Sequence, residues 1–275
     1  MASSYIPRLE DMQAAVNKAY IKNNIVEMAN GQPTFTYDEA SLDRIIKYIS
    51  IDRLAAYLIL SKKDRERAIR LYERNTELSE ALYGVVQGLE VTLRNAVHQI
   101  LESDHGQDWH DAFALEESEK SAVDEAKRSI ENRQETITQG RIVAELTFGF
   151  WVRLFSASYA KTLWGPSLRK IVPLRVDRRA VYARLKDMKT LRNRIAHHNR
   201  IIGHPKTVAI QYQELIETIG WFSGDTKNWV EQTNCVGERL EKKFPPKPPL
   251  QTHPPDDAHE ARPNGERRQA PTSKG

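Results

Sequence analysis

An arginine, an asparagine and a histidine stand close together between Leu191 and His198, at spacings that suit phosphate chemistry. Asn193 follows Arg192 directly, and His197 comes after four intervening residues. Arginine keeps its charge and forks onto phosphate oxygens, whereas histidine both takes and gives a proton near neutral pH. The pair is a minimal set of groups for cutting RNA without a metal ion. Such a pattern in isolation is more often a solvated polar face, so its context decides.

Apolar residues around the motif recur at three, four and seven residue steps, which predicts an amphipathic helix facing a core. The stripe consists of Leu185, Met188, Leu191, Ile195 and Ile202. At about 100° per residue, Asn193 and His197 lie on the far side of this stripe and Arg192 lies on its flank. We therefore assign His197 to chemistry and His198, on the opposite flank, to packing or support. The two imidazoles exchange roles if the helix rotates or ends early.

Helical spacing predominates along the rest of the chain, which predicts an all-α fold. The strongest apolar stripe runs from Leu78 to Leu101, and Gly84 and Gly88 within it are expected to mark a close helix crossing. Further helices are expected over 42–49, 65–75, 116–133 and 143–164, with a cap at Thr76 and a loop over 103–111.

A polar stripe of Glu90, Arg94 and His98 runs beside the apolar stripe at four-residue steps. One interpretation is a weak ion pair between Glu90 and Arg94 within the helix. The other is that the stripe faces the motif helix, with Glu90 orienting a positive group and Arg94 adding a phosphate contact. The sequence leaves both open.

Basic residues lead directly into the motif and include Arg184 and Lys189. They would hold an RNA backbone by neutralising its phosphates, or form an ordinary helix surface. Aromatic residues are dense between Phe148 and Trp164, where helical spacing favours core packing over base stacking. The segment from Phe244 to Gly275 holds eight of the 13 prolines and almost no apolar side chains, which predicts a disordered tail.

Composition and motifs exclude several classes of protein. The net charge of +4 is too small to indicate a nucleic-acid-binding protein by itself. Apolar runs fall far short of the roughly 20 residues that span a bilayer, and the N-terminal residues do not form a secretion signal. We therefore expect a cytoplasmic protein that is not bound to a membrane. No nucleotide-binding loop or zinc-protease motif occurs. His105 and His110 lie among aspartates, but we expect a capped loop there, with no metal and no cofactor.

Several separated blocks resemble the Abi-like proteins, bacterial abortive-infection proteins of the HEPN superfamily. The resemblance runs from about Asp43 to Ile202. Its blocks are Arg53 to Leu58, Leu78 to Tyr83, Leu89 to Asn95, Thr147 to Trp151, Leu163-Trp164 and Arg192 to His198, in the family's order. Blocks in the right order are far more specific than the motif alone.

The resemblance implies a HEPN-like helical bundle, here residues 1–242 followed by the tail 243–275. It also implies metal-independent RNA cleavage by a toxin or defence effector, in a homodimer whose motif helices face each other. The expected partners are RNA and a neutralising antitoxin of RNA or protein. A non-catalytic RNA-binding or sensor module and a protein-interacting scaffold are the alternatives. The site residues are Arg192, Asn193 and His197 as the catalytic set, with Glu90, Arg94, Arg184, Lys189 and His198 in supporting or RNA-binding roles.

Overall fold

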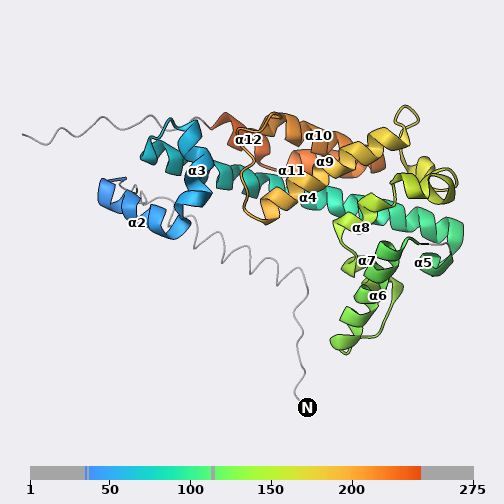
Figure 1. Ribbon diagram of the computed structural model, residues 1–275. Coiled ribbons are helices and arrows are strands. Elements are labelled where there is room, and N and C mark those ends of the chain that lie inside the picture. Colours follow the sequence, from blue (N-terminus) through green and yellow to red (C-terminus); the bar gives the residue numbers. More distant parts are fainter. Residues whose placement is uncertain (1–34, 36, 113–114, 243–275) are drawn as a thin grey trace, which may run out of the picture. The chain divides into compact units, whose positions relative to one another are not determined.

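Helices form all the regular structure in the residues that the structure describes, which are 35, 37–112 and 115–242 (Figure 1). This computed structural model confirms the all-α fold class, because no strand occurs in those ranges. The helices belong to one compact unit that ends at Glu241. The segment 243–275, where we predict a disordered tail, lies outside the described residues.

The elements follow one another with short connections. The helices of ten residues or more are α2 (Glu39–Ile49), α3 (Ile51–Leu60), α4 (Arg65–His105), α6 (Glu117–Asn132), α9 (Arg178–Ala196), α10 (Val208–Phe222) and α11 (Gly224–Thr233). The shorter elements are α5 (Trp109–Ala112), α7 (Gln139–Glu145), α8 (Phe148–Arg153), η1 (Ala157–Tyr159), η2 (Ala160–Trp164), η3 (Leu168–Ile171) and α12 (Val236–Glu241).

The longest helix, α4, corrects two predictions. We predicted a cap at Thr76, but the helix continues through it, and the Thr76 hydroxyl donates to the carbonyl of Tyr72 one turn back, at 3.3 Å, instead of capping a new helix. We also predicted a loop over 103–111, whereas α4 extends into this range and ends at Gly106, whose φ of 88° favours a residue without a side chain. One uninterrupted helix therefore supplies the core with a continuous apolar stripe.

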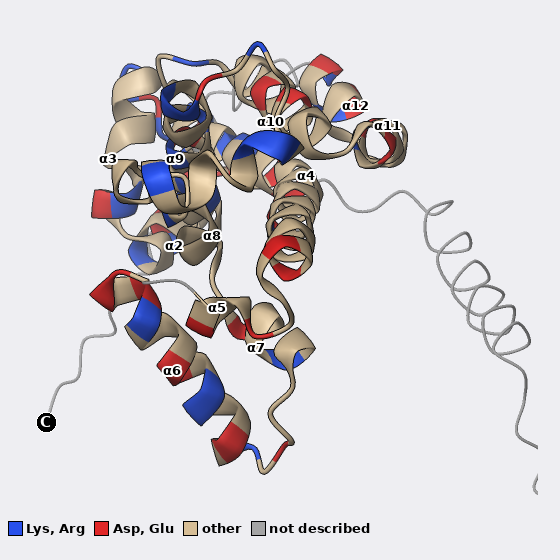
Figure 2. Cartoon of the chain, turned by 90° about the vertical axis from the view of Figure 1, so that its right-hand side faces the viewer, with Lys and Arg blue, Asp and Glu red and all other residues tan. Residues whose placement is uncertain are grey.

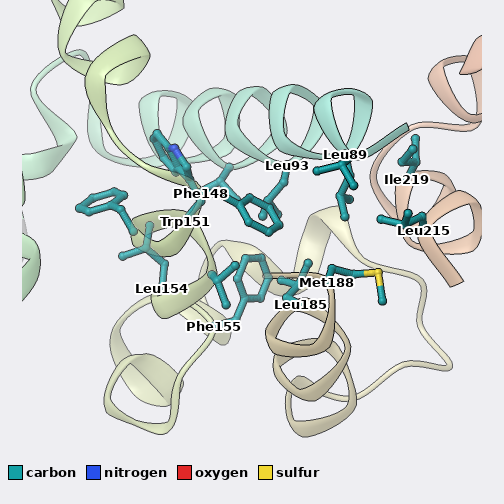
Figure 3. Packing of buried hydrophobic residues seen from close by; sticks show 14 of the residues in the cluster. Leu89, Leu93, Phe148, Trp151, Leu154, Phe155, Leu185, Met188, Leu215 and Ile219 are labelled. Atoms are coloured by element: carbon teal, nitrogen blue, oxygen red, sulfur yellow. The ribbon is translucent and has the colours of Figure 1, made fainter. Parts of the chain in front are cut away.

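The main core forms where the apolar stripe of α4 meets α8, α9 and α10 (Figure 3). Leu89 and Leu93 of α4 point toward Leu185 and Met188 of α9, and all four side chains are buried. Burying each such side chain stabilises the fold by about 1.5–3 kcal/mol. This contact confirms the predicted apolar stripes of both helices and fixes α9 along α4.

The aromatic segment over 143–164 is not the single helix that we predicted. It is divided into α7, α8, η1 and η2, because Leu146 is extended and the Thr147 hydroxyl caps a new helix by accepting from the Phe150 amide at 3.4 Å. The prediction that its aromatic residues form core is confirmed. Phe148, Phe150, Trp151, Phe155 and Tyr159 are buried, and Trp164 packs against them while partly buried.

A smaller apolar cluster joins α2, α3 and the start of α4. Ile202, in the segment after α9, packs against both this cluster and the main core. The segment that carries the motif histidines is therefore followed at once by an apolar anchor. Within the described residues, no helix combines the length and the apolar character needed to cross a membrane.

The two glycines of α4 differ in their surroundings. A Cβ built on Gly88 would lie 2.9 Å from Val230 Cγ2 of α11, closer than real Cβ atoms come, whereas one on Gly84 would meet nothing within 4 Å. The predicted close helix crossing therefore exists at Gly88 and is absent at Gly84.

We expect Gly88→Ala to destabilise the protein by about 1–3 kcal/mol, because the methyl group forces α11 away from α4. Gly84→Ala is the matched control and should be neutral or stabilising by up to about 1 kcal/mol, since alanine favours the helix and has space. Urea denaturation followed by circular dichroism measures both. Equal stability of the two variants would contradict the close crossing.

Candidate active site at the end of α9

The motif helix α9 ends one residue before His197, earlier than the sequence pattern predicted. Asp177 caps its start by accepting from the Ala180 amide at 2.8 Å. At its end the His198 amide donates to the Ile195 carbonyl at 3.1 Å, and the Asn199 amide donates to the Arg194 carbonyl at 2.7 Å. This pair of hydrogen bonds is a Schellman motif, which stops a helix by turning the chain back.

His198 occupies the left-handed position of this turn, with a φ of 55°, where glycine or asparagine is usual. We expected His198 to pack or to support the site; its side chain is exposed, so packing is wrong and the supporting role stays a prediction. The reason is that the helix ends before it, and the helical flank that we assigned to it does not exist. His197, the C-cap residue, is exposed as well. Both imidazoles therefore project from a turn at the end of α9.

Two distant side chains hold this turn in place. The Arg53 guanidinium of α3 donates to the His198 carbonyl at 2.8 Å. Asn75, buried in α4, accepts from the amides of Ile201 and Ile202 at 2.7 and 3.3 Å. Sequence reasoning missed both residues. An asparagine at an apolar position of the helical spacing, three residues before Leu78, was the one sequence signal that could have indicated Asn75.

A histidine in the left-handed position is conformationally strained, which gives a direct test. We expect His198→Gly to stabilise the protein by about 0.5–1 kcal/mol, because the strain of about 1–2 kcal/mol is removed and part of that gain is lost to the flexibility of unfolded glycine. His198→Ala keeps the strained backbone and serves as the control without this gain. Urea midpoints compare the two variants, and a glycine variant no more stable than the alanine one would argue against the strain.

Arg192 and Glu90 form an ion pair between α9 and α4. The Arg192 Nε donates to the Glu90 carboxylate at 2.6 Å, with side-chain exposures of 40% and 27%. Among the described residues, Glu90 forms no ion pair with Arg94, whose Nε bonds to Asn95 instead. The second interpretation of the polar stripe is thus confirmed for Glu90, which orients the motif arginine.

The rest of that stripe has other partners. His98 Nδ1 accepts from the indole of Trp109 at 3.1 Å, which ties α4 to the start of α5. Arg94 is partly exposed on the surface of α4. Asn193 is partly exposed on α9, and its carbonyl accepts from the His197 amide at 3.0 Å. The structure thus places Asn193 and His197 one helical turn apart, as the sequence predicted.

Basic residues cover much of α9, whereas acidic and basic segments alternate along α6 (Figure 2). Several basic residues on α9 and in the segment before it have protein partners. Arg184 bonds to Glu217 at 3.1 Å and lies over the Trp221 ring, so it faces α10 rather than Arg192. Arg169 donates to three carbonyls, and Arg178 to one. The Lys189 ammonium lies beside Gly149 at the start of α8.

Two hollows flank His198. One of about 480 Å³ lies between α4 and the end of α9, and its lining includes Ser79, Glu80, Tyr83 and Ile195. We call it the α4–α9 hollow. The other, of about 410 Å³, lies between α3 and the segment after α9, where Arg53, Tyr57 and Arg200 line it. Burial raises the pKa of Tyr57 to about 12, and the two arginines oppose that rise. His198 is thus the motif residue that borders both hollows.

The histidine and aspartate segment near α5 has structural contacts. Asp104 pairs with Lys170 at 2.9 Å. His110 is buried with its Nδ1 3.3 Å from the Asp111 carboxylate, and burial lowers its pKa from the ordinary value. Within the described ranges, no three His, Cys, Asp or Glu side chains gather in a way that could hold a metal ion.

Comparison with known proteins identifies one family. A family model described as Abi-like protein matches residues 44–203, which is more than half of the chain. The match begins in α2 and ends shortly after α9, so it contains Glu90, Arg192 and both motif histidines. No curated protein matches the chain, and no solved structure matches it.

Proposed function

The chain belongs to the Abi-like protein family, and on that basis we propose that it is a metal-independent endoribonuclease. It acts as a toxin or as an effector of phage defence by abortive infection. Its place of action is the cytoplasm, its substrate is RNA, and an antitoxin of RNA or protein holds it in check.

The observation that carries this proposal is the orientation of Arg192 by Glu90. A guanidinium has five N–H donors, and the contact with Glu90 engages Nε. Neither Nη atom of Arg192 has a hydrogen-bond partner among the described residues, and the side chain is 40% exposed. A guanidinium that is oriented through Nε and has both Nη groups unpaired is suited to donate hydrogen bonds to two phosphate oxygens.

In the proposed reaction the ribose 2′-hydroxyl attacks the adjacent phosphorus and displaces the 5′-oxygen. His197 takes the proton of the 2′-hydroxyl or gives one to the leaving oxygen. Arg192 stabilises the negative charge that the phosphorane gains, and Asn193 orients the phosphate or the imidazole. Arg94 and Lys189 add positive charge along the path of the strand. The products are a 2′,3′-cyclic phosphate and a 5′-hydroxyl.

One copy of the chain supplies one His197, and a single histidine serves both proton transfers poorly. Arg192 and His197 also lie about 140° apart around the axis of α9, with the arginine turned toward α4. A two-fold symmetric dimer with facing α9 ends, as in the HEPN superfamily, places two copies of each residue in one cleft. We therefore propose a homodimer as the active form.

The separation of Arg192 from His197 within one copy favours a second candidate function. Within one copy no hydrogen bond or ion pair joins Arg192 to His197, and a protein that binds RNA without cutting it needs no such pairing. In this alternative the protein is a non-catalytic RNA-binding or sensor module of a defence or toxin–antitoxin system.

One experiment separates the two functions. Pure protein is incubated with total RNA and with transfer RNA, with and without excess chelator, and the product ends are identified. We expect cleavage that persists in chelator and spares both DNA and RNA carrying a 2′-O-methyl group at the cut site. RNA binding that weakens with salt but yields no cleavage would support the sensor module instead.

A further inference from the structure

The α4–α9 hollow has a polar lining that the proposed reaction does not use. One stripe of α4 forms its wall, with Tyr72, Ser79, Glu80 and Tyr83 on the same face of the helix. The end of α9 closes it and brings His198 to its edge. A hollow of about 480 Å³ beside His198 is large enough for a single base with its sugar.

Three of these side chains have polar or aromatic groups that no described residue engages. The Ser79 hydroxyl is buried without a hydrogen bond, which costs stability unless something fills the site. Glu80 forms no ion pair with any described residue, and the Tyr83 ring is 60% exposed. A buried hydroxyl, a free carboxylate and an open aromatic ring together provide what single-stranded RNA recognition uses for a base.

We propose that the α4–α9 hollow binds a guanine base of the substrate RNA next to the cleaved bond. This inference rests on the proposed function for the identity of the substrate. Tyr83 stacks on the base, Glu80 accepts from its Watson–Crick edge, and the Ser79 hydroxyl bonds to the buried side of the base.

The carboxylate of Glu80 selects guanine among the four bases. An ionised carboxylate is an acceptor only, with two oxygens side by side. Guanine places the N1–H and N2–H donors next to each other, so both oxygens are satisfied. Adenine and cytosine present one amino group beside a ring nitrogen that repels the carboxylate, and uracil has one N–H between two carbonyls. Guanine alone matches a carboxylate in this bidentate way.

The position of the hollow fits a base near the reacting phosphate. Tyr83 and Glu90 are seven residues apart on one face of α4, which is about 10 Å along the helix. Arg192 bonds to Glu90, and the residues at the end of α9 line the hollow. An unstacked strand with its base in the hollow therefore brings a neighbouring phosphate to the motif residues.

Binding of free nucleotides tests the hollow without requiring catalysis. Guanosine 3′-monophosphate and adenosine 3′-monophosphate are titrated into the whole protein by calorimetry. We expect guanosine 3′-monophosphate to bind about tenfold more tightly or better, as for hydrogen bonds to a charged group. Glu80→Gln should bring the two affinities to within about twofold, because an amide offers one acceptor instead of two.

Matched variants keep the result interpretable. Glu125→Gln makes the same charge change on an exposed residue of α6 and should leave the preference intact. Tyr83→Ala should weaken both nucleotides, whereas Tyr48→Ala, at a side chain 84% exposed on α2, should weaken neither. Circular dichroism of each variant verifies that it folds.

Cleavage-site mapping distinguishes failure of this inference from failure of the proposed function. Selective binding of guanosine 3′-monophosphate that depends on Glu80, in a protein that cuts no RNA, upholds the hollow and rejects the nuclease. Cutting without guanine preference, unaffected by Glu80→Gln, rejects the hollow and upholds the nuclease. Equal affinity for both nucleotides, or a hollow occluded by a second copy of the chain, also overturns the inference.

Discussion

Replacing Arg192 with lysine is expected to slow RNA cleavage by about 10²–10³-fold, the loss seen when one donor to a transition-state oxyanion is removed. Lysine keeps the positive charge but has no planar fork, so it lacks the two parallel N–H donors that Arg192 can present to a phosphate while its Nε bonds to Glu90. Single-turnover cleavage of a labelled RNA measures the effect. The ion pair is partly exposed, so the free energy of unfolding should change by no more than about 1 kcal/mol.

Two further variants isolate the cause. Arg179→Lys changes an exposed arginine at the start of the same helix and should leave the rate unchanged. Glu90→Gln removes the charge that orients Arg192, and it should have less effect in the lysine background than in the wild type if the two residues act together. A lysine variant that cuts RNA nearly as fast as the wild type would reduce Arg192 to a charge that attracts the substrate.

The sequence predicted the parts of this site that depend on periodicity. The stripe of Leu185, Met188, Leu191 and Ile195 is buried as expected, because helical spacing alone decides which side chains face a core. The same spacing brought Glu90 to the side of α4 that meets α9. These are local regularities, and a single sequence contains them.

Periodicity could not predict where α9 ends. The turn depends on Arg53, which lies 145 residues before His198, and on Asn75, which lies 126 residues before Ile201. A left-handed histidine is unfavourable by itself and persists because such distant contacts hold it. The continuity of α4 through Thr76 has the same kind of cause, since burial of the surrounding apolar residues outweighs the preference of threonine for a cap.

Replacing His197 with alanine is expected to abolish RNA cleavage and any toxicity to growing cells, while the helical circular dichroism stays that of the wild type. The imidazole is exposed on the C-cap of α9, so its removal leaves no cavity. Because the helix ends at Ala196, His198 projects from the same turn, and His198→Gly is the essential comparison. Full cleavage by the His197 variant together with loss in the His198 variant would transfer the proton-transfer role to His198.

Mixing inactive subunits tests whether the cleft is shared. If both copies of α9 contribute to one cleft, a heterodimer of Arg192→Ala and His197→Ala subunits retains one intact arginine and one intact histidine on opposite chains. Recovered cleavage in the mixture requires these two residues to act across the interface, and it should reach at most about half the wild-type rate, since random pairing makes about half of the dimers mixed. Two inactive variants that remain inactive together, in a mixture shown to exchange subunits, would mean that one arginine and one histidine on opposite chains do not make an active cleft. Beside a wild type that cleaves RNA, that result would mean either that the cleft needs both copies of each residue, as expected if one histidine serves both proton transfers poorly, or that the two residues act within one copy in spite of their separation of about 140° around α9.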